Sequence, residues 1–262
     1  MKPPRSELLL RGEAVTVRLG KALVVDSANL TLRAGEFVAL VGPNGAGKTT
    51  LMRALAGLQP ARGKIELRER RLDSFGPRER ARSIAYLPQG HVFYWPVSAA
   101  SVVGLGRYPH ADAFSRPSPE DATAVSRALK ATGLEPLADR RVTTLSGGER
   151  ARVALARALA TEAPIVFADE PTASLDPRHQ LLVMEMLRRT TRTGAAVLAI
   201  LHDITLAARF ADRIVLMDGG RIVADGLPAD ALNPAQIAKV FGVEAIDVDI
   251  GEGVVPVLRR PI

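Results

Sequence analysis

Apolar residues form unbroken runs in some parts of the chain and alternate with polar residues in others. The runs at 37–41, 164–168 and 195–201 are continuous, which is typical of strands buried on both faces of a parallel sheet. Residues 14–19, "AVTVRL", alternate instead, as in a strand with one solvated face. Shorter strands are predicted at 63–67, 83–88, 213–217 and 221–226.

Helical patterns separate most of these strands. They are predicted at 48–57, 147–160, 178–192 and 204–211. Because strands and helices alternate, we expect an α/β fold with a mostly parallel sheet covered on both faces. The strand-rich N-terminal stretch is expected to add an antiparallel β portion.

The middle of the chain has a different character. Prolines interrupt it repeatedly, and two helical patches lie among them near 98–105 and 119–132; the prolines are Pro96, Pro109, Pro117, Pro119 and Pro136. We interpret about 90–159 as an inserted α-helical subdomain. The expected organisation is one domain over 1–242, with its core at 1–89 and 160–242, and a short C-terminal extension over 243–262.

Composition narrows the class of protein. The chain has 262 residues, 47% of them hydrophobic, which supplies a substantial core. It has no cysteine, which excludes disulfides and thiolate metal sites and suits a reducing compartment. The start of the chain has three consecutive leucines, fewer than the roughly 7–15 apolar residues of a secretory signal, so none is expected. No apolar run approaches the ~18 residues of a membrane span.

The chain is strongly basic, with a formal net charge of +7 and a pI of about 10.2. This charge could attract nucleic acid, nucleotides or anionic lipid head groups. Aromatic residues make up only 4% of the chain, and no basic run is interleaved with them as on a single-strand platform. We therefore expect no nucleic-acid partner.

The stretch "VGPNGAGKTTL" matches the glycine-rich phosphate loop, with a strand predicted before it and a helix after it. Backbone N–H groups of the loop can receive phosphates, and Lys48 supplies a positive charge for the β- and γ-phosphates. The Thr49 hydroxyl can ligate Mg²⁺, and Thr50 can reach the α-phosphate. The predicted fold is therefore a phosphate-loop NTPase of the RecA-like type. Its nucleotide-binding residues here are Gly42, Asn44, Gly45, Ala46, Gly47, Lys48, Thr49 and Thr50.

Polar side chains end three other predicted strands. Asp169 and Glu170 follow the run at 164–168, His202 follows 195–201, and Gln89 follows 83–88. The carboxyl ends of parallel strands meet at one edge of a sheet, where ligands bind. Asp169 can hold Mg²⁺, Glu170 can act as general base toward a water, and His202 can contact the γ-phosphate. Gln89 can touch the metal or the water.

Two glycines open the predicted helix in "LSGGERARVALARALA" at 145–160. Glycine is a poor helix former, so Gly147 and Gly148 need a local reason. Ser146 can cap this helix, and bare glycines leave its first N–H groups open to an anion. The sequence thus predicts a second anion-binding helix start.

Taken in order, the phosphate loop, Gln89, "LSGGE", "IVFADE", "SLD" at 174–176 and His202 resemble the ATP-binding subunit of ABC transporters over about residues 12–242. The resemblance implies ATP and Mg²⁺ as cofactors, and it implies a head-to-tail dimer of two copies. In that dimer Ser146, Gly147 and Gly148 would bind the γ-phosphate held by the other copy. Asp176 matches the D-loop of the family and is counted with the nucleotide-binding residues.

A narrower resemblance points to importers of iron–siderophores, haem or vitamin B12. It rests on "VVGLGRYPH" at 102–110, "DEPTASLDPRHQ" and the segment beginning "LHDITLAARF". It implies a transmembrane permease dimer, an indirect link to a substrate-binding protein, and a peripheral location on the cytoplasmic face of the inner membrane. Tyr94, Trp95 and Arg107 are the expected docking surface, although Trp95 is equally suited to local packing.

The family usually stacks an aromatic residue on adenine near positions 18–19, where this chain has Arg18 and Leu19. The Arg18 guanidinium or aliphatic contacts from Val24 could replace it. Two other functions remain open from the sequence. One is an ABC-type ATPase not coupled to transport, for example in iron–sulfur assembly. The other is a nucleic-acid-binding module.

Overall fold

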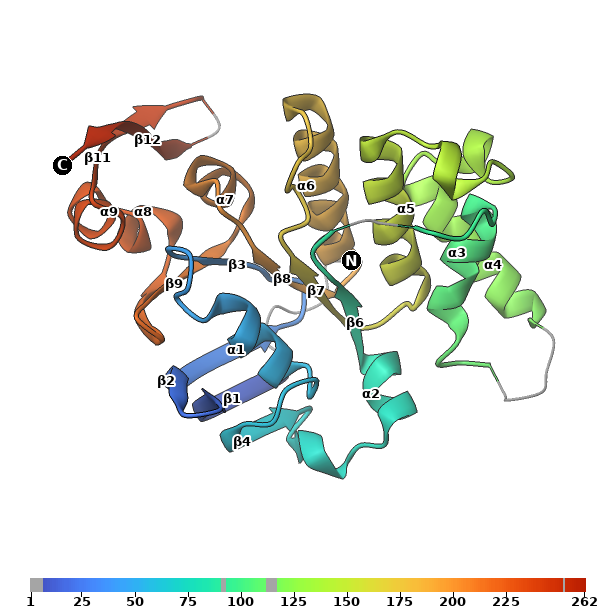
Figure 1. Cartoon of the computed structure of the whole chain (residues 1–262), viewed down its shortest axis with the longest axis horizontal. Helices are drawn as coiled ribbons and strands as arrows, with labels where there is room; N and C mark the ends of the chain where they lie inside the picture. Colours follow the sequence, from blue (N-terminus) through green and yellow to red (C-terminus); the bar gives the residue numbers. More distant parts are fainter. Residues whose placement is uncertain (1–6, 91–92, 112–116, 252) are drawn as a thin grey trace.

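The computed structural model describes residues 7–90, 93–111, 117–251 and 253–262. The first six residues, part of the segment tested for a secretory signal, lie outside this range. A six-stranded sheet forms the centre (Figure 1), in the order β10 (Arg221–Gly226), β9 (Arg213–Asp218), β3 (Phe37–Val41), β8 (Ala196–Ile200), β7 (Ile165–Asp169) and β6 (Ile84–Leu87). The strands from β9 to β6 pair in parallel, and β10 is antiparallel to β9. The predicted mostly parallel sheet is confirmed.

A four-stranded sheet covers one face of the central sheet. It consists of β2 (Ala22–Arg33), β1 (Leu8–Leu19), β4 (Arg62–Leu67) and β5 (Arg70–Arg71), all paired antiparallel. Helix α1 (Lys48–Leu55) packs in the core shared with both sheets, where its Leu51, Met52 and Leu55 are fully buried. Burial of these side chains fixes α1, and therefore the loop before it, against the sheet.

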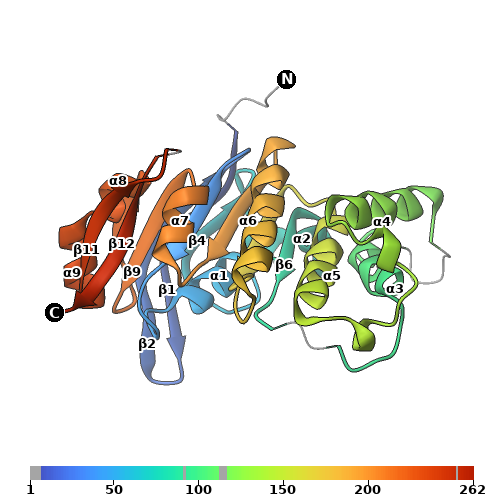
Figure 2. The same ribbon diagram turned by 90° about the horizontal axis from the view of Figure 1, so that it is seen from above.

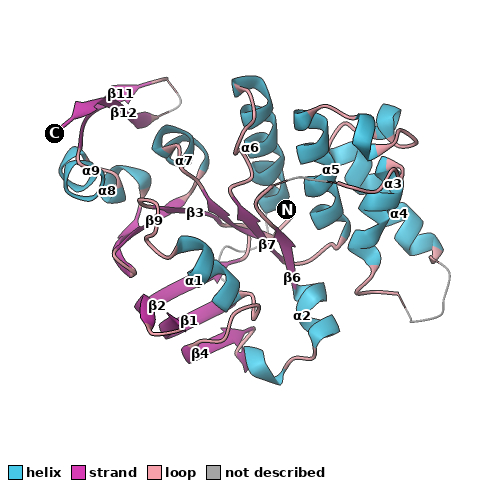
Figure 3. Ribbon diagram, viewed as in Figure 1, coloured by secondary structure: helices cyan, strands magenta, loops and turns pink. Residues whose placement is uncertain are grey.

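Helices cover the other face (Figure 3): α5 (Gly147–Ala160), α6 (Pro177–Arg192) and α7 (Ile204–Phe210). Side chains alternate along each strand, so Val38 and Leu40 face α1 whereas Phe37, Ala39 and Val41 face these helices. Both faces of the strands are buried, which is why their sequences are continuous apolar runs.

The predicted helical subdomain lies at one end of the molecule (Figure 2). Helices α3 (Ala99–Gly104), α4 (Pro119–Ala131) and α5 share a core of their own, joined by 3-10 turns at Leu105–Arg107, Glu135–Leu137 and Val142–Thr144. Helix α5 belongs to two cores, because Leu155 faces the central sheet while Val153 and Ala156 face α3 and α4. This helix therefore ties the subdomain to the sheet.

Arg107 was expected on the docking surface, and this expectation is wrong. Its guanidinium is buried, with Nε 2.8 Å from Asp121 Oδ1 and Nη1 2.8 Å from the carbonyl oxygen of Ala160. Nη1 also lies 3.1 Å from Glu162 Oε2. Because three acceptors surround the charge, Arg107 joins α4 to the end of α5 instead of facing solvent.

Several elements were not predicted. Helix α2 (Pro77–Ser83) has no apolar stripe, and the turn Leu72–Ser74 and helices α8 (Pro228–Ala231) and α9 (Pro234–Phe241) are short. The C-terminal extension forms an antiparallel hairpin of β11 (Val243–Asp249) and β12 (Val254–Pro261). The Thr205 hydroxyl of α7 donates to the Pro256 carbonyl at 2.8 Å, so the hairpin packs on the main body. Across the described ranges, no helix has the length and apolar character needed to span a membrane.

Candidate nucleotide-binding site

The glycine-rich loop between β3 and α1 adopts backbone conformations that require glycine at two places. Gly42 has φ +148°, and a Cβ there would lie 2.1 Å from the carbonyl oxygen of Met217. Gly47 has φ +93°, and a Cβ there would lie 2.6 Å from the carbonyl oxygen of Val24. The loop thus packs closely between β9 and β2. Its tip at Asn44 and Gly45 is exposed.

Helix α1 begins at Lys48 with Gly47 as its N-cap, and no side chain caps it. Its first N–H groups are therefore free to bind an anion. Ala46, which precedes the cap, is buried, and Thr50 lies half-buried in the first turn. The predicted phosphate-binding residues are in this way assembled in one loop and one helical turn.

Lys48 holds the loop closed on itself. Its Nζ donates to the carbonyl oxygens of Gly42 at 2.7 Å and Pro43 at 2.8 Å. Burial lowers the pKa of the ammonium group, and the negative charges of Glu170 and Asp169 oppose this shift. The lysine is therefore a partly desolvated cation between a phosphate loop and two carboxylates, a position in which its charge acts strongly.

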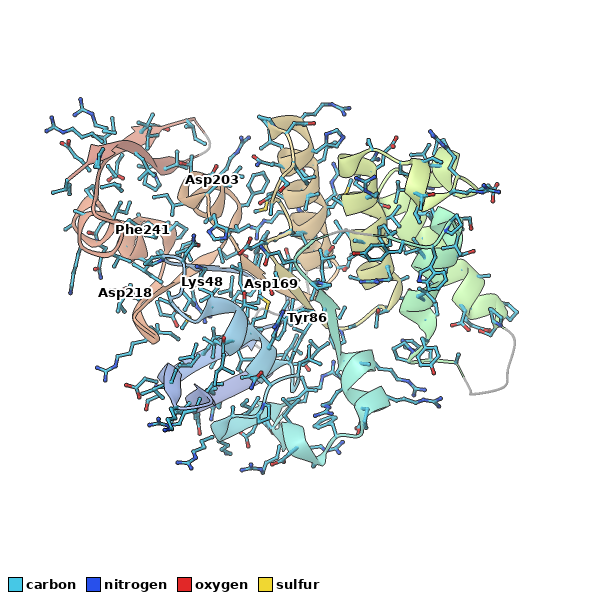
Figure 4. The ribbon with its side chains drawn as sticks, in the orientation of Figure 1. Lys48, Tyr86, Asp169, Asp203, Asp218 and Phe241 are labelled. Carbon is cyan, nitrogen blue, oxygen red and sulfur yellow. The ribbon has the colours of Figure 1, made fainter. Side chains whose placement is uncertain are left out.

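Asp169 is the last residue of β7 and is fully buried. Its Oδ1 accepts a hydrogen bond from the Thr49 hydroxyl at 2.9 Å, and its Oδ2 accepts one from the Tyr86 hydroxyl at 2.9 Å. Figure 4 shows Lys48, Asp169 and Tyr86 gathered near the middle of the molecule. The predicted pair of Thr49 and Asp169 is thus brought together by α1 and β7.

Tyr86 was missed by the sequence interpretation. It lies on β6, three positions before Gln89, in a strand whose other residues are apolar. Burial raises the pKa of its phenol to about 12. A lone polar group in an otherwise apolar strand next to a predicted site was the available signal, since buried tyrosine hydroxyls usually have a partner.

Glu170 lies at the centre of a second cluster. Its Oε2 accepts from Gln89 Nε2 at 2.6 Å, and its Oε1 lies 2.6 Å from His202 Nε2. The Glu170 backbone has φ +51°, a conformation that non-glycine residues rarely adopt. The three side chains predicted to be catalytic therefore meet at one point, held by the ends of β6, β7 and β8.

The signature stretch begins helix α5 as predicted. The Ser146 hydroxyl accepts from the Glu149 N–H at 3.2 Å, and Glu149 Oε2 accepts from the Ser146 N–H at 2.7 Å, which forms a capping box. The hydrogen bond from the Ser146 N–H holds the pKa of the Glu149 carboxyl group below its usual range. The two glycines differ, because a Cβ at Gly147 would meet open space whereas one at Gly148 would lie 2.4 Å from the His179 ring.

Asp176 caps helix α6 and also binds His179. Its Oδ1 accepts from the His179 N–H at 3.0 Å, and its Oδ2 lies 2.7 Å from His179 Nδ1. These contacts with His179 lower the pKa of Asp176. His179 thus lies between Gly148 and Asp176, two residues that the family resemblance assigns to nucleotide binding.

The region expected to meet adenine is the turn between β1 and β2. Arg18 and Leu19 are exposed there, and Arg18 Nη1 donates to the carbonyl oxygen of Lys21 at 3.3 Å. Val24 in the next strand is the residue whose carbonyl oxygen approaches Gly47. The turn therefore lies beside the phosphate loop, with Arg18 and Leu19 exposed on its surface.

The loop, the buried lysine, the Thr49–Asp169 pair and the strand-end Glu170 define a phosphate-loop ATPase. The family model described as "ABC transporter" matches residues 25–173. The chain belongs to the ABC transporter family, and it is an ATP-binding cassette, an enzyme that hydrolyses ATP.

Curated relatives are similar to this chain in sequence over nearly its whole length. The hemin import ATP-binding protein HmuV of Rhodococcus jostii is 41% identical over 98% of this chain and 89% of its own length. The ferric enterobactin transport ATP-binding protein FepC of Escherichia coli is 38% identical over 92% of this chain and 89% of its own length.

Solved structures show the same fold. A metal-chelate type ABC transporter in an inward-facing conformation has a TM-score of 0.84 at 25% identity, covering 97% of this chain and 98% of that one. A dimeric ATP-binding cassette in a post-hydrolysis state with ADP and phosphate has a TM-score of 0.73 at 28% identity, covering 84% and 99%.

Proposed function

We propose that this chain is the ATP-hydrolysing subunit of an importer for a metal chelate. The observation that carries the proposal is the cluster at the end of β7, where Asp169 binds Thr49 while Glu170 binds Gln89 and lies against His202. Strand ends that converge on a phosphate loop place a metal-binding carboxylate and a general base beside one nucleotide.

Mg²⁺ is the metal that these residues fit. Thr49 and Asp169 offer a hydroxyl and a carboxylate oxygen, and Gln89 is close enough to Glu170 to add an amide oxygen nearby. Within the described ranges no group of three or more His, Cys, Asp or Glu residues could hold a metal by itself. Mg²⁺ usually keeps water and phosphate ligands, so a pair of protein oxygens suits it.

Glu170 is proposed as the general base toward the attacking water. Its two carboxylate oxygens are each held by a neighbour, Gln89 and His202, so its orientation is set before substrate arrives. Lys48 is proposed to move from the carbonyl oxygens of its own loop to the β- and γ-phosphates, and the bare N–H groups of α1 complete the cradle.

A second copy of the chain is proposed to complete the site. Ser146 and Gly147 are exposed at the start of α5, where the helix dipole favours an anion. The family and the dimeric cassette structure support a dimer. We propose a head-to-tail pair, in which these residues and Asp176 face the phosphate bound by Lys48 of the other copy.

The permease is proposed to dock on a groove beside the helical subdomain. The groove, of about 420 Å³, lies between the end of α1, α2, β6 and the turn Leu105–Arg107. Leu58 and Leu105 stand exposed at its margin, and Tyr94 and Trp95 are 83% and 76% exposed in the segment after Gln89. Exposed apolar side chains that line a groove, as Leu58 and Leu105 do here, are typical of a protein interface, and Tyr94 and Trp95 offer further exposed apolar surface. Docking there would hold the chain on the cytoplasmic face of the membrane, as a peripheral subunit.

The cargo is proposed from the relatives. The two curated relatives are named for import of hemin and of ferric enterobactin, and the structural neighbour is of the metal-chelate type. We propose haem or a ferric siderophore, with cobalamin as the third member of this group. The cargo would be selected by the permease and a substrate-binding protein, which this subunit serves indirectly.

An uptake experiment tests the proposal. The gene is deleted in its source organism, and cells are given radiolabelled haem, a ferric siderophore or cobalamin, with and without the gene restored. Loss of uptake of one cargo, restored by the wild type and not by Glu170→Gln, supports it. Normal uptake of all three by the deleted strain, together with ATPase activity of the purified chain, would instead favour an ATPase unconnected with import of these cargoes, such as one in iron–sulfur assembly.

A further inference from the structure

We infer that Tyr86 is a positioning residue that orients the Asp169 carboxylate for the divalent cation accompanying ATP. The inference rests on the proposed function, since it takes Asp169 as a metal-binding residue. Tyr86 is neither in the phosphate loop nor at the end of its strand, and we infer that it acts through Asp169.

The two oxygens of Asp169 are divided between two donors. Oδ1 accepts from Thr49 on α1, and Oδ2 accepts from Tyr86 on β6, each at 2.9 Å. A carboxylate with one donor on each oxygen cannot rotate about its Cβ–Cγ bond without breaking a hydrogen bond. Since Thr49 is the proposed metal-binding hydroxyl, the Tyr86 bond keeps Oδ1 turned toward the metal position.

Burial gives this hydrogen bond its strength. Asp169 is fully buried, and the Tyr86 hydroxyl points into the same interior from a half-buried ring. A hydrogen bond between groups withdrawn from water is electrostatically stronger than one in solvent, because the local dielectric constant is lower. Removal of a residue that hydrogen-bonds to a metal-binding carboxylate typically weakens metal binding about 10–100-fold.

Tyr86 also lines the groove that we propose for the permease, together with Leu105 and Arg157. One side chain thus borders both the metal-binding carboxylate and the docking groove. Loss of the hydroxyl should therefore affect the metal while leaving the wall of the groove in place, because phenylalanine keeps the ring.

The test is Tyr86→Phe in the full chain, with binding measured in place of turnover. A fluorescent ATP analogue is titrated in EDTA, and Mn²⁺ binding to the ATP-saturated protein is followed by electron paramagnetic resonance. Metal-free ATP affinity should stay within twofold of wild type, whereas the Mn²⁺ dissociation constant should rise about tenfold. Tyr108→Phe, an exposed tyrosine of the insertion, is the matched control and should change neither.

Two results would overturn the inference. One is unchanged Mn²⁺ affinity in Tyr86→Phe; the other is an equal loss of metal-free and metal-dependent binding, which would indicate that Tyr86 only supports the fold. Failure of the proposed function is distinct, since wild-type protein would then bind ATP without any effect of Mn²⁺. Far-UV circular dichroism and the metal-free ATP affinity confirm that the variant is folded.

Discussion

The imidazole Nε2 of His202 lies 2.6 Å from Oε1 of Glu170, across the ends of two adjacent parallel strands. Gln89 occupies the other oxygen of the same carboxylate. Each carboxylate oxygen of Glu170 therefore has a neighbour that fixes its orientation. A fixed orientation is expected of a general base, which must face the water whose proton it accepts.

Replacing Glu170 with glutamine tests this role. The amide keeps the size of the side chain and one acceptor oxygen, replaces the other oxygen with an N–H donor, and removes the basicity. We expect ATP affinity close to wild type, hydrolysis reduced by about 10²–10⁴-fold, and accumulation of an ATP-bound dimer. Equilibrium ATP binding, phosphate release and size-exclusion chromatography with ATP measure the three quantities. Turnover at the wild-type rate would exclude Glu170 as the base.

Lys48→Ala addresses the phosphate loop. The change removes the cation that faces Asp169 and Glu170 and also removes the donor to the carbonyl oxygens of the loop. We expect ATP binding to be lost, because the two carboxylates then repel the phosphates without compensation. A fluorescent ATP analogue measures affinity, and Lys239→Ala, an exposed lysine of α9, controls for the general effect of losing a positive charge. Unchanged affinity in Lys48→Ala would contradict the assignment of the loop.

Arg107 supports the helical subdomain, so its loss should act on stability. Its side chain and that of Asp121 are 11% and 10% exposed. Arg107→Ala leaves the Asp121 carboxylate buried without its partner, which should reduce the free energy of unfolding by about 3–5 kcal/mol. Thermal and urea unfolding measure it. Arg178→Ala, an exposed position on α6, is the matched control and should change stability little.

The same pair predicts a pH dependence. The Arg107 hydrogen bond holds the pKa of Asp121 below the usual range of an aspartate. A carboxyl group with a lowered folded-state pKa stabilises the fold above its unfolded pKa and loses that effect as pH falls through the folded value. The stability difference between wild type and Arg107→Ala should therefore be full at neutral pH and shrink below about pH 4. A difference that grows on acidification would show that another contact of Arg107 dominates.

Sequence patterns predicted the parts of this molecule that local chemistry determines. Continuous apolar runs located β3, β7 and β8, and the strand-end positions of Asp169, Glu170 and His202 predicted a common edge of the sheet. The burial of Arg107 and the hydrogen bond of the Tyr86 hydroxyl depend on carboxylates 14 and 83 positions away. A sequence alone does not show which distant carboxylate a side chain meets, so both escaped prediction.

The two glycines of the signature stretch should respond differently to substitution. In Gly148→Ala the new methyl group meets the His179 ring, which Asp176 holds in place, so the variant should lose about 1–3 kcal/mol of stability. Gly147→Ala adds its methyl group in open space and should be neutral or slightly stabilising, as alanine favours a helix. Unfolding measurements on both variants, and on Gly148→Ala with His179→Ala, test the contact. Full loss of stability in the double variant would assign the effect to something other than His179.

Ser146→Arg separates the two sites that one chain contributes to a dimer. The serine caps α5 within its own chain, and its exposed position also allows it to face the phosphate of a second copy. Arginine there cannot cap the helix and would obstruct a partner, whereas the loop that holds Lys48 is untouched. We expect monomeric protein to bind ATP normally, ATP-dependent dimerisation to disappear, and hydrolysis to fall to background. Ser146→Ala is the comparison, since it removes the cap without adding bulk.

Mixing Ser146→Arg with Lys48→Ala subunits gives the decisive measurement. A head-to-tail dimer of the two retains one site with an intact loop and an intact opposing serine, so part of the hydrolysis should return. No recovery in the mixture, or loss of ATP binding by Ser146→Arg alone, would contradict a role of Ser146 at the other subunit's nucleotide.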